Sequence, residues 1–174
     1  MQDKDFKIYM NEAVRLAEIA ASMGEVPVGA VIVNNKNGEI TGRGFNRRET
    51  DRSPLAHAEI IAIEEASRTM NGWRLVDSTI FVTLEPCPMC SGAIINARLD
   101  RLVFGAFDKK GGAVESVQKM FELPYNYRPE VISGFMEEEC SQLLKDFFRE
   151  LRLKKKNNKI DNMVYVPYNI GEYI

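Results

Sequence analysis

The sequence predicts an α/β fold of three layers, in which a five-stranded mixed sheet lies between helices. Apolar residues recur at helical spacing in residues 6–23 and 137–153, which predicts two amphipathic helices. Residues 79–84 are nearly all apolar, as expected for a strand that is buried on both faces. A helical stretch and another apolar strand follow, and this order predicts a right-handed parallel crossover with helices covering the sheet.

The first third of the chain supplies a helix and a hairpin. The helix of residues 6–23 is expected to stop at Gly24, because glycine readily adopts the left-handed conformation that often follows a helix. Residues 26–33 are rich in β-forming side chains, and residues 40–46 alternate less regularly. The Asn-Asn-Lys-Asn-Gly stretch at residues 34–38 is typical of a hairpin. The first two strands should therefore be antiparallel neighbours.

The rest of the chain alternates helices, strands and polar loops. Expected helices span residues 55–70, 88–98, 117–121 and 137–153, expected strands span residues 79–84, 102–106 and 130–133, and expected loops span residues 47–54, 108–112 and 125–129. The sequence shows no internal repeat. We therefore expect one domain in residues 1–156, followed by a C-terminal tail of unknown role in residues 157–174.

Length and composition narrow the class of protein. The chain has 174 residues, a formal net charge of −2 and an apolar content ordinary for a soluble globular protein. It has no apolar run of the ~18 residues that a membrane span needs, and its charged N-terminus lacks the apolar centre of a signal peptide. Its three cysteines are too few for a disulfide framework. We therefore expect a cytoplasmic protein with no membrane partner.

Basic residues crowd one end of the chain, although the whole chain is mildly acidic. The cluster consists of Arg149, Arg152, Lys154, Lys155, Lys156 and Lys159. Such a cluster can contact the phosphates of a nucleic acid. The alternative is a solvated helix end, because cations are favoured at helix C-termini. The sequence leaves both interpretations open.

Two short motifs carry the chemistry. Cys87 and Cys90 are three residues apart, and a helix that starts at Pro88 would bring both sulfurs to its first turn, where the helix dipole favours metal-binding thiolates. His57, the only histidine in the chain, offers a third ligand. Three protein ligands leave one tetrahedral position of a zinc ion open to water, which is the catalytic arrangement. Glu59 is then placed to move the protons of that water.

A His-x-Glu motif followed by Pro-Cys-x-x-Cys is the known signature of zinc-dependent nucleobase deaminases. His57, Glu59, Pro86, Cys87 and Cys90 fill every position of this signature. The expected cofactor is one Zn2+ per chain, with a zinc-bound water or hydroxide. Because two thiolates nearly neutralise the ion, a nearby carboxylate base should matter, and we expect Glu59 to be the proton shuttle.

Several of these residues also have an alternative interpretation. Cys87 and Cys90 could form a redox disulfide, since Cys-x-x-Cys also occurs in thioredoxin-like proteins. Glu59 could cap the start of its own helix. Asp108 could be an ordinary turn residue. Cys140 lies on the apolar stripe of the last helix, and we expect it to be a small core residue.

Beyond the two motifs, the chain resembles the bacterial-type tRNA-specific adenosine deaminases, of the cytidine deaminase-like superfamily. The matching stretches are residues 25–30, 44–46, 56–59, 83–93, 104–113 and 146–149. The zinc motif alone specifies the superfamily, whereas Asn46, the loop at Asp108 and residues 146–149 point to the tRNA branch. The resemblance does not reach the expected tail, so it implies nothing about that segment.

The resemblance implies a homodimer with a cytidine deaminase-like fold that converts adenosine to inosine at the wobble position of a tRNA anticodon and releases ammonia. It implies zinc on His57, Cys87 and Cys90, with Glu59 as the proton shuttle. The expected partner is the tRNA anticodon stem-loop, whose unpaired bases are cheaper to flip into a pocket than paired ones. The substrate-binding residues that the resemblance implies are Val28, Asn46, Asp108, Lys110, Phe147, Phe148 and Arg149.

Three other functions share parts of this pattern. A deaminase of a free nucleobase or nucleoside, such as guanine or cytosine, would use the same zinc core with different loops. A non-catalytic zinc scaffold would be expected to lack Glu59, which is present. A redox protein would form a reversible disulfide between Cys87 and Cys90 and bind no zinc. The basic end of the chain favours an RNA substrate without excluding the free base.

Overall fold

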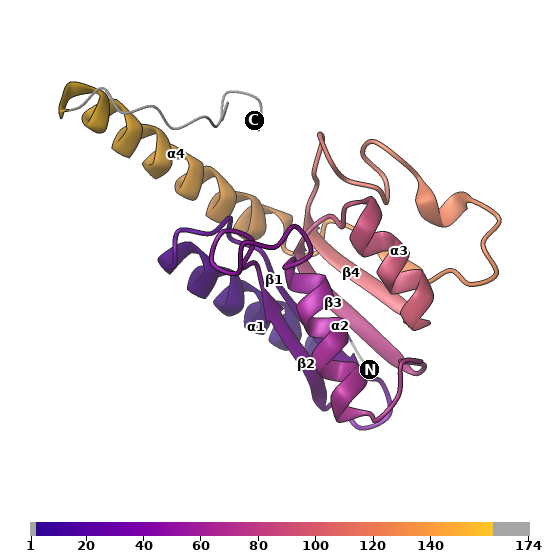
Figure 1. Cartoon of the computed structure of the whole chain (residues 1–174). Helices are drawn as coiled ribbons and strands as arrows, with labels where there is room; N and C mark the ends of the chain where they lie inside the picture. The colour runs from indigo at the N-terminus through magenta and orange to yellow at the C-terminus, as the bar shows by residue number, and fades with distance from the viewer. Residues whose placement is uncertain (1–2, 162–174) are drawn as a thin grey trace.

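A five-stranded mixed sheet lies between two layers of helices in the structure, a computed structural model that describes residues 3–161 (Figure 1). The helices are α1 (Asp3–Ser22), α2 (Ala58–Thr69), α3 (Pro88–Ala97) and α4 (Glu137–Asp161), with a short 3-10 helix at Met120–Glu122. The strands are β1 (Gly29–Asn34), β2 (Ile40–Phe45), β3 (Ser78–Leu84), β4 (Arg101–Ala106) and β5 (Glu130–Ile132). None of the helices in the described range is long and apolar enough to cross a membrane.

The strand order is β2-β1-β3-β4-β5. The antiparallel pair β1–β2 confirms the predicted hairpin. Strands β3 and β4 are parallel and are joined through α3, which confirms the predicted parallel connection through a helix. Since β1 also pairs antiparallel to β3, and β5 pairs parallel to β4, the sheet is mixed as predicted. The metal-ligand motif at residues 87–90 comes directly after β3, beyond the carboxyl end of a central strand, where open α/β sheets usually place their ligands.

One face of the sheet is covered by α1 and α4. The helical spacing of Phe6 and Met10 turns both side chains toward Phe81 of β3 and Val103 of β4 in one buried cluster. The rings of Phe6 and Phe81 pack edge to face with their centroids 5.3 Å apart. Cys140 near the start of α4 is buried in the same cluster, which confirms it as a core residue.

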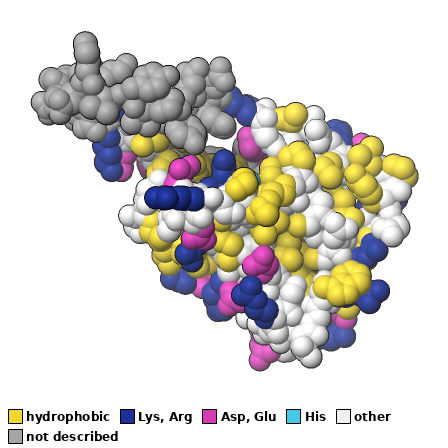
Figure 2. Space-filling model, viewed as in Figure 1, with side chains coloured by type: hydrophobic (Ala, Val, Ile, Leu, Met, Phe, Trp, Pro, Cys, Tyr) yellow, Lys and Arg dark blue, Asp and Glu magenta, His cyan; other side chains and the backbone are white. Residues whose placement is uncertain are grey.

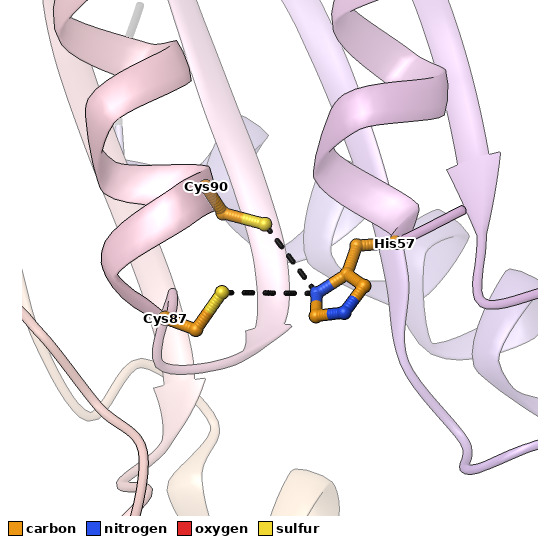
Figure 3. A group of neighbouring side chains, drawn as sticks. All are labelled: His57, Cys87 and Cys90. Atoms are coloured by element: carbon orange, nitrogen blue, oxygen red, sulfur yellow. Dashed lines mark hydrogen bonds between the residues drawn. The ribbon is translucent and has the colours of Figure 1, made fainter. Parts of the chain in front are cut away.

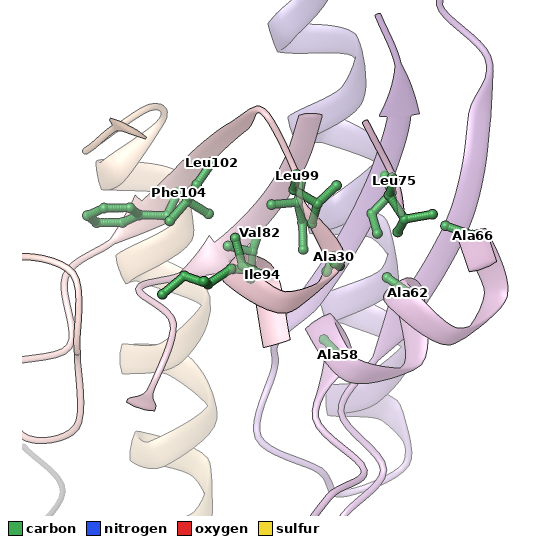
Figure 4. Packing of buried hydrophobic residues seen from close by; sticks show 14 of the residues in the cluster. Ala30, Ala58, Ala62, Ala66, Leu75, Val82, Ile94, Leu99, Leu102 and Phe104 are labelled. Carbon is green, nitrogen blue, oxygen red and sulfur yellow. The ribbon is translucent and has the colours of Figure 1, made fainter. Parts of the chain in front are cut away.

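The other face is covered by α2 and α3, which hold the predicted metal ligands. Ala62 of α2 and Ile94 of α3 meet Val82 of β3 and Phe104 of β4 in a second buried cluster (Figure 4). The two clusters lie on opposite faces of the sheet, which confirms the three-layer arrangement.

Helix α2 lies unusually close to β2 because both elements present small residues to each other. Ala58, Ala62 and Ala66 recur every four residues on the buried side of α2, and all three are fully buried. Gly42 and Gly44 of β2 lie directly beneath them. The missing side chains let the helix backbone approach the strand, and this contact fixes the start of α2 at the edge of the sheet.

Gly44→Ala is therefore expected to lower the free energy of unfolding by about 1–3 kcal/mol, as overpacking does in well-packed cores. A Cβ atom there would lie 2.7 Å from the backbone nitrogen of Ala62 and would overlap the carbonyl oxygen of Ala58. Gly72→Ala is the control, because its Cβ would meet only the Met70 carbonyl oxygen, at 3.9 Å. Urea unfolding of both variants measures the difference, and equal midpoints would contradict this packing.

Several expected boundaries differ from the structure, among them the start of β1, which is Gly29 and not residue 26. Helix α2 starts at Ala58, so His57 is its N-cap and not a residue of its first turn. The helix expected at residues 117–121 is replaced by a 3-10 helix at Met120–Glu122. The N–H groups of Val117 and Gln118 donate to the carbonyl oxygen of Gly112, and that of Met120 to Ala113, instead of to carbonyl groups four residues back. Helix α4 runs to Asp161 and not 153, since no glycine or proline interrupts residues 137–161. The expected tail thus starts inside α4, and residues 162–174 lie outside the described residues.

Candidate metal centre and active site

Two helix starts bring the three predicted metal ligands together (Figure 3). His57 is the N-cap of α2, and its extended backbone turns the chain from a polar loop into the helix. Cys87 is the N-cap of α3, and Pro88 takes the first helical position, where its missing N–H leaves no bond unmade. Cys90 lies in the first turn of α3 and is buried. Helices α2 and α3 cover the same face of the sheet, and their first residues lie side by side, so that His57 faces the two cysteines.

The distances among the ligand atoms fit a tetrahedral metal ion. Nδ1 of His57 lies 3.8 Å from Sγ of Cys87 and 3.5 Å from Sγ of Cys90. All three ligand atoms lie within 4.8 Å of one another. Zinc bonds of ordinary length at the tetrahedral angle would place a sulfur and a nitrogen about 3.6 Å apart. The structure therefore forms a His/Cys/Cys cluster with the spacing of a metal site.

The pKa values of the two thiols are shifted in opposite directions. A hydrogen bond from the Cys90 thiol, assisted by one from His57, lowers the pKa of Cys87 to about 4 despite its partial burial. The same bond and burial raise the pKa of Cys90. Cys87 is therefore a thiolate at neutral pH, as expected at a helix start. Cys90 would lose its proton when both sulfurs bind one cation.

Glu59 is the buried acid of the site. It lies in the first turn of α2, and only 4% of its surface is exposed. Burial raises the pKa of its carboxyl group, and the electrostatic effects of His57 and Cys87 on this group show that it lies beside the ligand cluster. A raised pKa makes it easier for a carboxyl group to hold a proton and then give it away, which general acid–base work requires.

Asn46 and Val28 are neighbours in the fold. The backbone N–H of Asn46 donates to the carbonyl oxygen of Val28 at 2.9 Å. Nδ2 of the buried Asn46 faces two acceptors, the carboxylate of Glu25 at 3.4 Å and the carbonyl oxygen of Val26 at 3.3 Å. The following residue, Arg47, is tied back to the residue before His57 by a backbone bond. The carboxamide is thus held in a fixed orientation near the ligand cluster.

Asp108 and Lys110 lie on the loop that follows β4, at the same sheet edge as Cys87. Oδ1 of Asp108 accepts the backbone N–H groups of Lys110 and Gly111, both at 3.0 Å. Asp108 therefore forms a turn, which is the alternative that its residue type suggested. This turn leaves Lys110 exposed at the tip of the loop.

The structure places Phe147, Phe148 and Arg149 on α4, which covers the face opposite to α2 and α3. The two rings are half-buried and pack edge to face at 5.4 Å. Arg149 is exposed and pairs with Asp146 at 2.7 Å.

Two buried carboxylates, those of Glu25 and Glu85, bind neighbouring loops in a way that the sequence does not predict. Glu25 accepts the backbone N–H groups of Glu49 and Thr50 as well as the Asn46 amide. Glu85, only 2% exposed, binds several N–H groups of the loop that starts at Asp108. Hydrogen bonds to the charged form keep the pKa of Glu85 low despite its burial. An acid next to an apolar strand is the only signal that the sequence offers for either residue.

Comparison with known proteins identifies the family. The model of the MafB19-like deaminase family matches residues 4–152. The tRNA-specific adenosine deaminase of Bacillus subtilis (strain 168) is 50% identical over 151 residues, which cover 86% of this chain and 92% of that protein. The protein of the same name from Haemophilus influenzae is 46% identical over 151 residues, which cover 86% of this chain and 87% of that protein.

Solved structures agree with this fold. A chain solved in a study of A-to-I editing by tRNA:A34 deaminases at the wobble position is 41% identical, with a TM-score of 0.76, and the match covers 79% of this chain and 99% of that one. A guanine deaminase from Nitrosomonas europaea, at 23% identity and a TM-score of 0.66, shares the fold alone, over 80% of this chain and 82% of that one. From the family match and the two relatives at 46% and 50% identity, the chain belongs to the family of tRNA-specific adenosine deaminases.

Proposed function

We propose that the chain is a zinc-dependent hydrolase that converts adenosine to inosine at the wobble position of a tRNA anticodon and releases ammonia. The observation that carries the proposal is the convergence of His57, Cys87 and Cys90 beside the buried carboxyl group of Glu59. Membership of the tRNA-specific adenosine deaminase family supports adenosine as the reacting nucleoside and tRNA as the molecule that contains it.

His57 and the two cysteines would hold one zinc ion per chain. When bound, zinc lowers the pKa of a water molecule and makes that water a nucleophile near neutral pH. The two thiolates offset the charge of the ion, so less of the activation comes from the metal than at a site with three neutral ligands. A base in the protein must therefore supply the remaining activation.

Glu59 supplies that base and then acts as an acid. Its carboxylate takes a proton from the water that attacks C6 of adenine, and gives it to the ring nitrogen beside the attacked carbon. It then transfers the second proton of the water to the departing amine, which leaves as ammonia. The burial that raises the pKa of Glu59 favours the protonated form between these steps.

The remaining predicted residues would bind the RNA. Val28 and the fixed carboxamide of Asn46 would contact the base that has left the anticodon stack. Asp108 and Lys110 would approach the nucleotides beside it from the other side of the cluster. Further contacts would come from α4, which projects away from the sheet in Figure 1 and bears Phe147, Phe148 and Arg149. Flipping the base is less costly in a loop than in a duplex.

We also infer a homodimer. Hydrophobic side chains gather on the face that α2 and α3 cover (Figure 2). A shallow groove of about 330 Å³ lies there, and Trp73 at its edge is 55% exposed. Large exposed aromatic residues beside an apolar groove are typical of interfaces. The groove is lined by Ile63, Ser67, Trp73, Ala93, Asn96 and Ala97.

A substrate panel tests the proposed function. Zinc-loaded protein is incubated with an anticodon stem-loop that carries adenosine at the wobble position, with the same stem-loop carrying adenosine one position away, and with free adenosine, guanine and cytosine. We expect inosine from the first substrate only. Deamination of a free base without reaction of the stem-loop would keep the zinc chemistry and overturn the substrate.

A further inference from the structure

We propose that Glu85 is a positioning residue whose carboxylate sets the pose of the loop at residues 108–116 beside the candidate active site. The loop carries Asp108 and Lys110 and joins β4 to the segment that leads to β5. The inference rests on the proposed function where it assigns this loop to RNA binding. The contacts of the carboxylate stand independently of it.

The two oxygen atoms of Glu85 hold the two ends of the loop. Oε1 accepts the backbone N–H groups of Val114, Glu115 and Ser116 at 3.1, 2.8 and 2.9 Å. Oε2 accepts the backbone N–H of Asp108 at 3.0 Å and the hydroxyl group of Ser116. One buried carboxylate thus closes the loop, and hydrogen bonds to a charged acceptor are among the stronger ones in proteins.

The backbone around Glu85 completes the closure. The carbonyl oxygen of Pro86 accepts the N–H of Ala113 at 2.8 Å, and the carbonyl oxygen of Asp108 accepts the N–H of Gly112 at 2.9 Å. A Cβ atom at Gly112 would overlap the carboxylate of Glu85 and lie 2.6 Å from the carbonyl oxygen of Asp108. Only glycine therefore fits where the loop crosses over Glu85.

Glu85 also ties the loop to the metal-ligand segment. It stands two residues before Cys87, and its own N–H donates to the carbonyl oxygen of Ala106 at 2.8 Å. The position of the loop is thus fixed relative to the ligand cluster through one short, rigid segment. Reaction at a flipped base requires such registration, because small displacements of positioning groups lower the rate strongly.

Glu85→Gln tests the inference with little change in volume. Its single remaining oxygen can keep the bonds to residues 114–116, whereas its amide nitrogen would face the N–H of Asp108 and leave that bond unmade. We expect amide hydrogen exchange in the peptide of residues 107–112 to be about tenfold faster. We expect KM for the stem-loop to rise about tenfold, with kcat within about threefold and the zinc content unchanged.

Gly112→Ala displaces the loop without altering any charge, so it should reproduce both changes. Thr79→Val is the control, because it removes a buried hydroxyl that donates to Asn35 at 2.7 Å near the other end of β3. It should alter stability without altering the exchange of the loop or KM. Unchanged exchange or unchanged KM in Glu85→Gln, with wild type active on the stem-loop, would overturn the inference. Absence of inosine with wild type would instead overturn the proposed function, and the exchange data would still decide whether Glu85 holds the loop.

Discussion

Glu59→Ala is expected to lower kcat for inosine formation about a thousandfold while the zinc content stays at one ion per chain. The carboxyl group lies in the first turn of α2, beside the ligand cluster, but it is not one of the three clustered ligands. Its removal therefore takes away the proton carrier and leaves the metal ligands in place. Kinetics on the stem-loop and metal analysis of the same preparation measure both quantities.

Glu64→Ala is the matched control, because Glu64 is an exposed acid on the same helix and pairs with Arg68. It should retain both activity and zinc. Loss of zinc from Glu59→Ala would show that the carboxylate holds the metal centre together. Unchanged kcat would show that another group moves the proton.

Cys90→Ala is expected to abolish stoichiometric zinc binding and to lower activity by more than about a hundredfold. Its sulfur lies 3.5 Å from Nδ1 of His57 and is buried, so water cannot easily take its place. The melting temperature should also lose its dependence on added zinc, since a ligand stabilises a fold only in proportion to its binding. Metal analysis and thermal unfolding with and without zinc give the two readouts.

Cys140→Ala separates the loss of a metal ligand from the loss of a buried thiol. Cys140 is buried on the opposite face of the sheet, against Gly105 of β4. Its replacement should cost about 1 kcal/mol of stability through the small cavity and leave zinc binding intact. Zinc bound at one ion per chain in Cys90→Ala would contradict the assignment of this ligand.

Local patterns predicted most of the fold because each depended on neighbouring residues. The helical spacing of Phe6 and Met10, the hairpin stretch at residues 34–38 and the apolar run of β3 each fixed an element without information from the rest of the chain. The approach of Gly42 and Gly44 to α2 depends on contacts between distant residues, so no single segment predicts it.

The ligand cluster was predictable because His57, Cys87 and Cys90 match a motif whose spacing reflects two helix starts. Glu25 and Glu85 were not, since their partners are backbone N–H groups, which carry no residue type. The turn at Asp108 was predictable, in contrast, because its carboxylate binds N–H groups only two and three residues further along the chain.

The most direct test of the account is to run wild-type protein with the wobble-adenosine stem-loop in water enriched in oxygen-18. The product nucleoside is then analysed by mass spectrometry and the released ammonia is counted. Hydrolytic deamination predicts inosine at the wobble position, one heavy oxygen atom in each inosine and one ammonia released for each. Absence of inosine, or inosine whose oxygen does not come from the water, would contradict the account.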